Sequence, residues 1–299
     1  MDLDKLYRDF IDLTNKQFKL GDFDAEHPIF IDLMKKQKMD LRLGVWLSFL
    51  YMAYYDEASA WATHLETDLF TVPGKVDYPI GMNRRNLFGG KILRHFESLV
   101  ENSRRAKDWP IHNFTGDPEA DWDVLKSNIG DVWGNGRFAI YTTAEMIQKV
   151  CNVPVTITGF DNKDSSGPAD AIARLSGCSK DDVKALDIAG DNLYNRVVKT
   201  KLKPFYIGVD RGVVESVLCN FSGICRGRYY SGRNLDRQQE RILRVETKHN
   251  VDLSILWDTR SEVFDHRYLG EYQGWDGIDK GRLVSYMQTG EVKWTFDER

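Results

Sequence analysis

The chain has 299 residues, of which 42% are hydrophobic and 29% are charged, and its formal net charge is −4. These values indicate a globular protein with room for one large hydrophobic core or two smaller ones. The negative net charge excludes a protein that coats nucleic acid by bulk electrostatics, but it is compatible with a local basic face on an acidic body.

The four cysteines, Cys151, Cys178, Cys219 and Cys225, form no C-x-x-C pair and match no zinc pattern. So few cysteines in a chain of this length favour a reducing cytoplasm. The most apolar stretch, residues 41–65, has charged residues in its interior, and the chain begins with charged residues rather than with the apolar segment of a signal peptide. We therefore expect no membrane partner.

Apolar residues recur at helical spacing through most of the chain, so we expect a mainly α fold with small irregular or β additions. In chain order, helices are expected over residues 2–19, 28–38, 41–65, 92–105, 122–150, 168–175, 179–199, 213–221 and 235–250, where 122–150 is a helix, a hairpin and a second helix. Gly21 predicts the end of the first helix, Ser179 with Asp182 predicts an N-cap, and residues 205–209 predict a short strand.

Three regions follow from this order: an N-terminal helical region (1–115), a central region (116–250) and a C-terminal extension (251–299). We expect all three to form one compact domain, because a chain of this length can still build a single core.

The segment Val132-Trp133-Gly134-Asn135-Gly136-Arg137-Phe138-Ala139 has a Gly-x-Gly turn just before a predicted helix. Two glycines allow a tight turn and a close approach of the backbone to a ligand, and the N–H groups at the start of the following helix suit a phosphate. The small Ala139 would let the two helices pack closely. The alternative is a plain turn between two helices with a glycine cap. A dinucleotide-binding loop is excluded, because a third glycine is missing.

This segment resembles the helix-hairpin-helix element of DNA glycosylases, in which the hairpin grips one backbone phosphate without reading sequence. The resemblance implies that Gly134, Asn135 and Gly136 contact the DNA backbone. In DNA glycosylases a catalytic aspartate lies a little farther along the chain, and here Asp161, Asp164 and Asp170 lie in that range. A loop aspartate that bonds its own backbone is the alternative for each, and we expect it for at least two of the three.

A second segment of interest contains Arg226, Arg228 and Arg233 together with glycines and two adjacent tyrosines, Tyr229 and Tyr230. A planar guanidinium binds phosphate or carboxylate oxygens in pairs, and glycines let the backbone approach such an anion. Tyr229 and Tyr230 are candidates for stacking on a base, with the alternative that one of them packs inward. The pattern favours a clamp for pyrophosphate or the DNA backbone over a solvated loop.

The helix after this loop places Arg237, Arg241 and Arg244 on one face. Acidic residues nearby partly compensate the charge, so for Arg241 and Arg244 we expect a solvated helix face. Other basic residues gather in clusters that are each expected to be ordinary surface, but that together suit a phosphate track. These clusters are Arg84, Arg85, Lys91 and Arg94; Arg104, Arg105 and Lys107; and Lys199, Lys201 and Lys203.

Neither a metal site nor a nucleophilic cysteine is predicted. None of the six histidines pairs with another at metal-ligand spacing. Cys219 lies in an apolar stretch with no visible histidine partner, so we expect it to be a small buried residue.

With both segments considered, the chain resembles the bacteriophage amino acid:DNA transferases, which belong with the proposed α-glutamyl/putrescinyl-thymine pyrophosphorylases. The resemblance covers about residues 122–244. The likeness lies in Trp133-Gly134-Asn135-Gly136-Arg137-Phe138-Ala139-Ile140-Tyr141 with Glu145, in Ser166-Gly167-Pro168, and in Glu215-x-x-Leu218-Cys219 through Gly227-Arg228-Tyr229-Tyr230-x-Gly232-Arg233-x-x-Asp236. It implies a helical fold related to the helix-hairpin-helix DNA glycosylases.

The resemblance also implies a step in thymine hypermodification of phage DNA. The amine of a free amino acid would displace pyrophosphate from 5-(pyrophosphoryloxymethyl)uracil in double-stranded DNA, in the cytoplasm of the infected bacterial host. The base must leave the stack to be reached, which calls for an aromatic pocket. No cofactor is required, although a divalent metal would help to neutralise the pyrophosphate.

Specific side chains fit the parts of this reaction. The leaving pyrophosphate needs cationic donors, the incoming amine needs a carboxylate base, and the carboxylate of the amino acid needs a guanidinium. We assign Arg226, Arg228 and Arg233 to the pyrophosphate. Asp161 is the first candidate for the base and Glu215 is the second. Arg137 or Arg237 is assigned to the carboxylate of the amino acid.

Two alternatives stay open at this point. A helix-hairpin-helix DNA glycosylase would use a single aspartate, leave an abasic site and have no need of the arginine-rich loop. A non-catalytic DNA-binding protein would use both loops only to touch phosphates.

Overall fold

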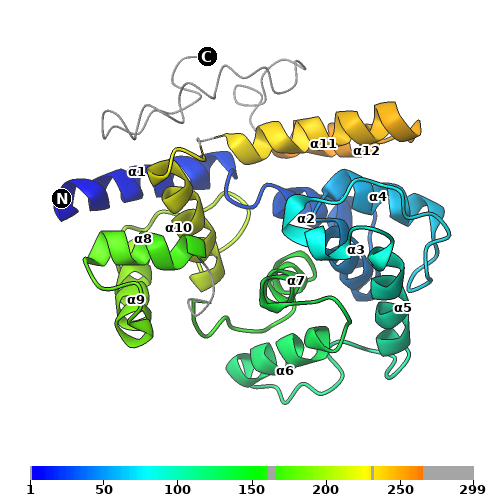
Figure 1. Ribbon diagram of the computed structural model, residues 1–299, viewed down its shortest axis with the longest axis horizontal. Coiled ribbons are helices and arrows are strands. Elements are labelled where there is room, and N and C mark those ends of the chain that lie inside the picture. Colours follow the sequence, from blue (N-terminus) through cyan, green and yellow to red (C-terminus); the bar gives the residue numbers. More distant parts are fainter. Residues whose placement is uncertain (1, 161–165, 230–231, 265–299) are drawn as a thin grey trace. The chain divides into compact units, whose positions relative to one another are not determined.

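The computed structural model describes residues 2–160, 166–229 and 232–264, and all regular elements in these ranges are helices (Figure 1). The predicted mainly α fold is therefore confirmed. The helices are α1 (Leu3–Leu20), α2 (Glu26–Lys36), α3 (Leu41–Tyr54), α4 (Glu57–Glu66), the short 3₁₀ helix η1 (Met82–Leu87), α5 (Lys91–Ser103), α6 (Pro118–Gly130), α7 (Arg137–Val150), α8 (Ser166–Ser176), α9 (Val183–Lys199), α10 (Arg211–Cys225), α11 (Arg233–His249) and α12 (Ser254–Val263).

Two predicted helices have different bounds. The apolar stretch 41–65 is two helices and not one, because Tyr55 adopts a left-handed conformation (φ 49°) and the Asp56 carboxylate then caps α4 by accepting a hydrogen bond from the Ser59 N–H at 2.9 Å. Helix α9 starts after Asp182, whose side chain accepts from the Ala185 N–H, so Asp182 is the N-cap and Ser179 is not.

The strand predicted over residues 205–209 is wrong. This segment is irregular, and within the described ranges no strand lies beside it to form a ladder. Its aromatic residues pack on other aromatic rings. The Tyr206 ring stacks on Phe23 with ring centroids 5.6 Å apart, and Phe205 contacts Phe264 edge-on.

The described residues divide into two compact units. Unit 1 takes in the described parts of 1–25, 157–237 and 264–299, and unit 2 takes in 26–156 and 238–263. Helix α11 belongs to unit 1 as far as Arg237 and to unit 2 from Gln238 onward.

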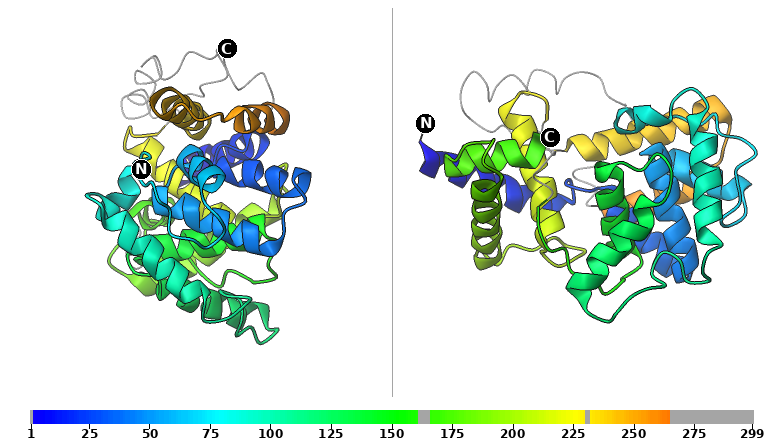
Figure 2. Two further views of the ribbon diagram at one scale, coloured as in Figure 1. Left: turned by 90° about the vertical axis from the view of Figure 1, so that its right-hand side faces the viewer. Right: turned by 60° about the horizontal axis from the view of Figure 1, so that its bottom comes forward.

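In unit 1, helix α10 packs against α8, and α1 contacts both of them, as Figures 1 and 2 show from several sides. The apolar faces of these helices meet in one core with α9, in which Phe10 and Phe221 lie edge to face with ring centroids 5.5 Å apart. Gly21 ends α1 in a left-handed conformation, as predicted.

In unit 2, helix α3 is the central element. Every residue from Gly44 to Tyr54 is buried, and α3 packs against both α4 and α7. Helix α7 in turn contacts α2 and α6, so it is held from several sides. No helix in the described part of the chain is long and apolar enough to span a membrane.

Candidate functional site

The predicted helix, hairpin and helix are present in unit 2 as α6, a short turn and α7. Gly134 has a positive φ of 87°, and a Cβ atom at this position would lie 2.9 Å from the Leu87 side chain. The positive φ strongly favours glycine here, and the Leu87 side chain would have to shift for any larger residue. Ala139 is buried, and α7 packs on α6.

Side chains of η1 and α5 form hydrogen bonds with the carbonyl groups of this hairpin. Arg84 donates to the Gly134 carbonyl at 3.0 Å and to the Asn135 side-chain oxygen at 3.1 Å, and Asn86 also donates to the Gly134 carbonyl, at 2.9 Å. His95 Nδ1 lies 2.7 Å from the Trp133 carbonyl, which can only accept, so Nδ1 carries the proton.

Arg84 and His95 are buried, although Arg84 had been expected at the surface. Arg84 is 2% exposed, and burial lowers its pKa to about 10. Burial, with a smaller contribution from the charge of Arg84, lowers the pKa of His95 to about 3, so this histidine is neutral at physiological pH. Neither role could be predicted from local patterns, because the partners lie some forty to fifty residues away along the chain.

The end of the hairpin, where Gly136 leads into α7, is accessible to solvent. Gly136 precedes the first turn of α7 with no side-chain cap, it is exposed, and no atom lies within 4 Å of the position that a Cβ would take. The first N–H groups of α7 therefore have room for an anion that approaches closely. The arrangement has the geometry that a backbone-phosphate grip requires.

In unit 1 the arginine-rich segment follows α10, and its first arginine is fixed by an aspartate of α8. Arg226 contacts Asp170 through Nε at 3.1 Å and Nη2 at 3.0 Å, and the same carboxylate accepts from Ser222 and Arg174 at 2.9 Å each. Burial alone would raise the pKa of Asp170, but the hydrogen bonds from Arg174, Ser222 and Arg226 outweigh it and lower the pKa. Asp170 is thus an ionised anchor for Arg226.

Two segments of the family resemblance meet at the contact between α8 and α10. A Cβ atom on Gly167 would lie 2.8 Å from Cys219 Sγ, so the helices approach too closely for any larger residue. The prediction that Cys219 is buried is wrong, because it is exposed; Gly167 covers only one side of it.

The remaining arginines and tyrosines of the loop have different surroundings. Arg228 is exposed, and Arg233 donates a hydrogen bond to the Arg228 carbonyl while its guanidinium lies over the Tyr229 ring, 6.0 Å from the centroid. Tyr229 is only 5% exposed, so the prediction that it stacks on a base is not supported. Tyr229 instead packs inward, and its partner in that prediction, Tyr230, lies outside the described residues.

Tyr229 is held by Asp22, a residue that sequence reasoning missed. The Tyr229 hydroxyl donates to Asp22 Oδ2 at 2.7 Å, and the same carboxylate accepts from the Gly232 N–H at 2.5 Å and the Asn234 N–H at 2.9 Å. Burial raises the pKa of Asp22 to about 7, although these hydrogen bonds lower it. Asp22 ties the end of the arginine loop to the segment after α1.

The other predicted site residues are divided between the units. Glu215 on α10 and Arg237 on α11 are half-buried in unit 1, whereas Arg137, at the first position of α7, is half-buried in unit 2 with the hairpin. Asp161, the first choice for the base, lies outside the described residues.

Arg241 is half-buried and not solvated as expected, whereas Arg244 is exposed as expected but also forms an ion pair. Arg241 contacts the buried Glu57 at 2.7 Å, and Arg244 contacts the buried Asp56 at 2.5 Å. Burial raises the pKa of Glu57 to about 7, although Arg241 lowers it. These arginines therefore hold α11 to the start of α4.

A comparison with protein families shows which family contains these segments. Residues 83–230 match the family described as amino acid:DNA transferase. The chain belongs to this family. The match contains the η1 and α5 residues that hold the hairpin, the hairpin itself, Asp170 and the loop as far as Tyr230; Arg233 and Arg237 lie beyond it. No curated protein matches the chain.

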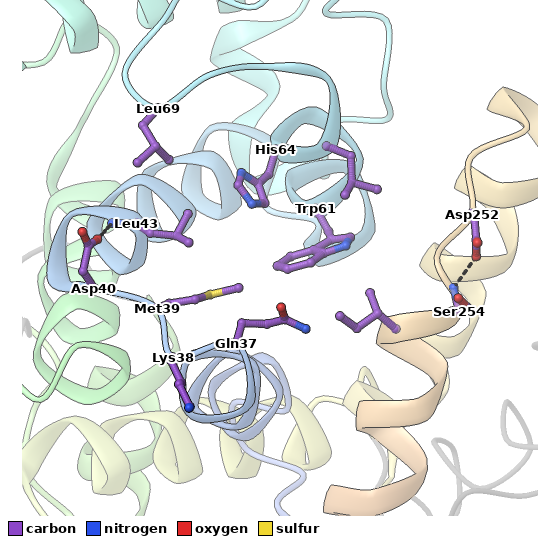
Figure 3. Close-up of a pocket in the computed structure, with 12 residues that line it drawn as sticks. Gln37, Lys38, Met39, Asp40, Leu43, Trp61, His64, Leu69, Asp252 and Ser254 are labelled. Carbon is purple, nitrogen blue, oxygen red and sulfur yellow. Dashed lines mark hydrogen bonds between the residues drawn. The ribbon is translucent and has the colours of Figure 1, made fainter.

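One cavity lies outside the transferase match. It has a volume of about 730 Å³ in unit 2, and its lining includes Trp61 and His64 of α4 and Asp252 before α12 (Figure 3). None of its lining residues falls within 83–230. Among the described residues, no group of three or more His, Cys, Asp or Glu side chains is placed to hold a metal ion.

Proposed function

We propose that this transferase moves the amine of a free amino acid onto 5-(pyrophosphoryloxymethyl)uracil in double-stranded DNA and displaces pyrophosphate. The observation that carries the proposal is the family match over residues 83–230, which includes both the open hairpin and the start of the arginine loop. The family description names the two reactants as an amino acid and DNA. The modified thymine and the pyrophosphate leaving group are proposed from the family resemblance, and the arginines of the loop fit them.

In the proposed reaction the nitrogen lone pair of the amino acid attacks the 5-methylene carbon of the base. A carbon–nitrogen bond forms, the carbon–oxygen bond to pyrophosphate breaks, and pyrophosphate leaves with the bonding electrons. The nitrogen then gives one proton to a base of the enzyme. The products are an aminomethyl adduct in DNA and free pyrophosphate.

Charge on the leaving group is the main electrostatic demand of this reaction, because negative charge grows on the bridging oxygen as the bond breaks. Arg228 is exposed, so its guanidinium is accessible to the pyrophosphate. Arg226 is oriented by Asp170, and Arg233 lies over Tyr229. We assign these three arginines to the pyrophosphate.

A carboxylate must accept the proton of the amine. Glu215, half-buried on α10, lies about three helical turns before Arg226 and is the candidate among the described residues; Asp161 stays the first prediction. Arg137 or Arg237 would bind the carboxylate of the amino acid. Tyr230 stays the prediction for stacking on the extruded base.

DNA binding is assigned to the hairpin of unit 2. The uncapped N–H groups at the start of α7 suit a backbone phosphate, and the missing side chain at Gly136 leaves room for it. We propose no required cofactor, although a divalent metal would assist the departure of pyrophosphate. The setting we propose is the cytoplasm of a phage-infected bacterium.

The proposal is tested by incubating the protein with DNA that bears the pyrophosphorylated base and a mixture of amino acids, followed by nucleoside mass spectrometry. We expect an aminomethyl adduct with the mass of one amino acid. An unchanged base with all twenty amino acids and ornithine would refute the transferase activity. Abasic sites would favour a helix-hairpin-helix glycosylase, and DNA binding without any product would favour a non-catalytic role.

A further inference from the structure

One face of helix α5 lies along the hairpin. Ser98 accepts a hydrogen bond from the Trp133 N–H at 2.9 Å, Asn102 donates to the Asp131 carbonyl at 3.3 Å, and Arg105 contacts the Asp131 carboxylate at 2.7 Å. Residues spaced by three, four and seven positions share a helix face. Lys91 and Arg94 therefore belong to the same face as Ser98 and Asn102, and Arg105 follows the end of the helix.

Arg94 on this face contacts the ring of Trp133. Its guanidinium carbon lies 4.3 Å from the centroid of the Trp133 ring, which is a cation–π contact. The backbone of Trp133 is held in place, because its backbone N–H is hydrogen-bonded to Ser98 and its backbone carbonyl to His95. A guanidinium that lies over an aromatic face keeps its N–H edges for other partners.

The charge of Arg94 has no acidic partner in the described parts of the chain. Arg105, two residues after the end of α5, is paired with Asp131, whereas Arg94 is exposed and forms no ion pair there. Lys91, one turn earlier, is likewise exposed and unpaired among the described residues. Two uncompensated cations thus lie on the α5 face beside the hairpin, in a protein whose net charge is −4.

We propose that Arg94, presented on Trp133, binds a second backbone phosphate of duplex DNA next to the phosphate that the hairpin binds. This inference rests on the proposed function, because it requires DNA as the substrate. A phosphodiester backbone is the ligand class that fits, since it supplies regularly spaced anions to several cations along one surface. The contact reads no sequence and fixes the orientation of the duplex.

The test is the salt dependence of binding to unmodified duplex DNA, measured by fluorescence anisotropy for the full chain. Loss of one phosphate contact lowers the slope of log affinity against log salt by about 0.9. We expect that decrease for Arg94→Gln, with weaker binding at low salt. Arg94→Lys keeps the charge, so its slope should stay near that of the unchanged protein.

Lys126→Gln is the matched control. Lys126 also lies over a tryptophan, Trp122, at 5.5 Å, but it is paired with Asp123 at 2.9 Å, so its removal should leave the slope unchanged. Thermal melts confirm that each variant is folded. If Arg94→Gln keeps the slope of the unchanged protein, the inference is wrong. If the unchanged protein binds no DNA, the proposed function fails and this inference fails with it.

Discussion

At the residue scale, the arginines of this protein differ in what their charge contacts. Arg84 is 2% exposed and gives its hydrogen bonds to the hairpin, whereas Arg226 is bound to Asp170 on α8. Arg228 is exposed at the surface of the loop. A buried arginine must satisfy its donors within the protein, so Arg84 shapes the hairpin and is not available to a ligand.

Arg228→Ala should lower the rate of amino acid transfer by about 100-fold, the typical cost of removing one donor that stabilises developing negative charge. DNA affinity should fall far less, because the loop is assigned to the leaving group and the hairpin to DNA. Rates of adduct formation and DNA affinities from anisotropy measure the two effects, and Arg8→Ala, an exposed arginine of α1 outside the family match, is the control. Equal losses in both measurements would reduce Arg228 to a backbone contact.

His95 should make unit 2 sensitive to acid. Its pKa is about 3 in the folded protein and near 6.5 when unfolded, so the unfolded chain binds the proton more readily. The stability that depends on neutral His95 is fully present above pH 6.5 and is lost as the pH falls from 6.5 toward 3. Between pH 7 and pH 4.5 the loss should be on the order of 2 kcal/mol.

Urea unfolding of the protein and of His95→Gln at a series of pH values measures this contribution. The variant lacks an ionisable group at this position, so the difference in unfolding free energy between the two proteins should shrink as the pH falls. A difference that stays constant with pH would show that His95 is not a buried neutral histidine.

At the scale of elements, the two glycines of the hairpin have different roles: Gly134 adopts a backbone conformation that favours glycine, and Gly136 leaves space beside the start of α7. Gly134 has a φ of 87° and the Leu87 side chain beside it, whereas Gly136 has an ordinary φ of −88° and open space around it. Gly134→Ala should therefore destabilise the protein by about 1–2 kcal/mol from backbone strain alone. Gly136→Ala should cost less stability but weaken DNA binding, because the added methyl group faces the proposed phosphate.

Thermal unfolding and DNA anisotropy on both variants give the comparison. The expected pattern is a lower melting temperature for Gly134→Ala, and a well-folded Gly136→Ala protein with reduced affinity. Full affinity in Gly136→Ala would contradict a close approach of DNA at the start of α7.

Much of this element structure could be predicted from periodicity. The amphipathic spacing of α1 and α5 and the glycines of the hairpin are local signals, and they gave nearly the observed helices. The break at Tyr55 was missed, because a non-glycine residue takes the left-handed conformation there and apolar residues continue on both sides of Asp56 and Glu57. Helix α12 was also missed.

The contacts that build the site depend on partners far away in the chain. Asp22 bonds to Tyr229 more than two hundred residues later, and Arg84 bonds to the hairpin some fifty residues later. Spacing along a helix cannot reveal such pairs. The same limit explains why Arg241 was expected in solvent although it contacts Glu57.

At the scale of the whole molecule, the assigned functions fall on different units. The hairpin and the α5 face belong to unit 2, whereas Arg226, Arg228 and Arg233 belong to unit 1. Substitutions in the hairpin should therefore act mainly on DNA affinity, and substitutions in the arginine loop mainly on the chemical step. Both units contribute to the segment that matches the transferase family.

The most direct test of the account is the stoichiometry of the reaction. With DNA that carries 5-(pyrophosphoryloxymethyl)uracil and an isotope-labelled amino acid that is a donor, pyrophosphate release and labelled adduct should appear in equal amounts, and Arg228→Ala should slow both together. Pyrophosphate released without labelled adduct would mean that water is the acceptor, and it would contradict the proposed transfer.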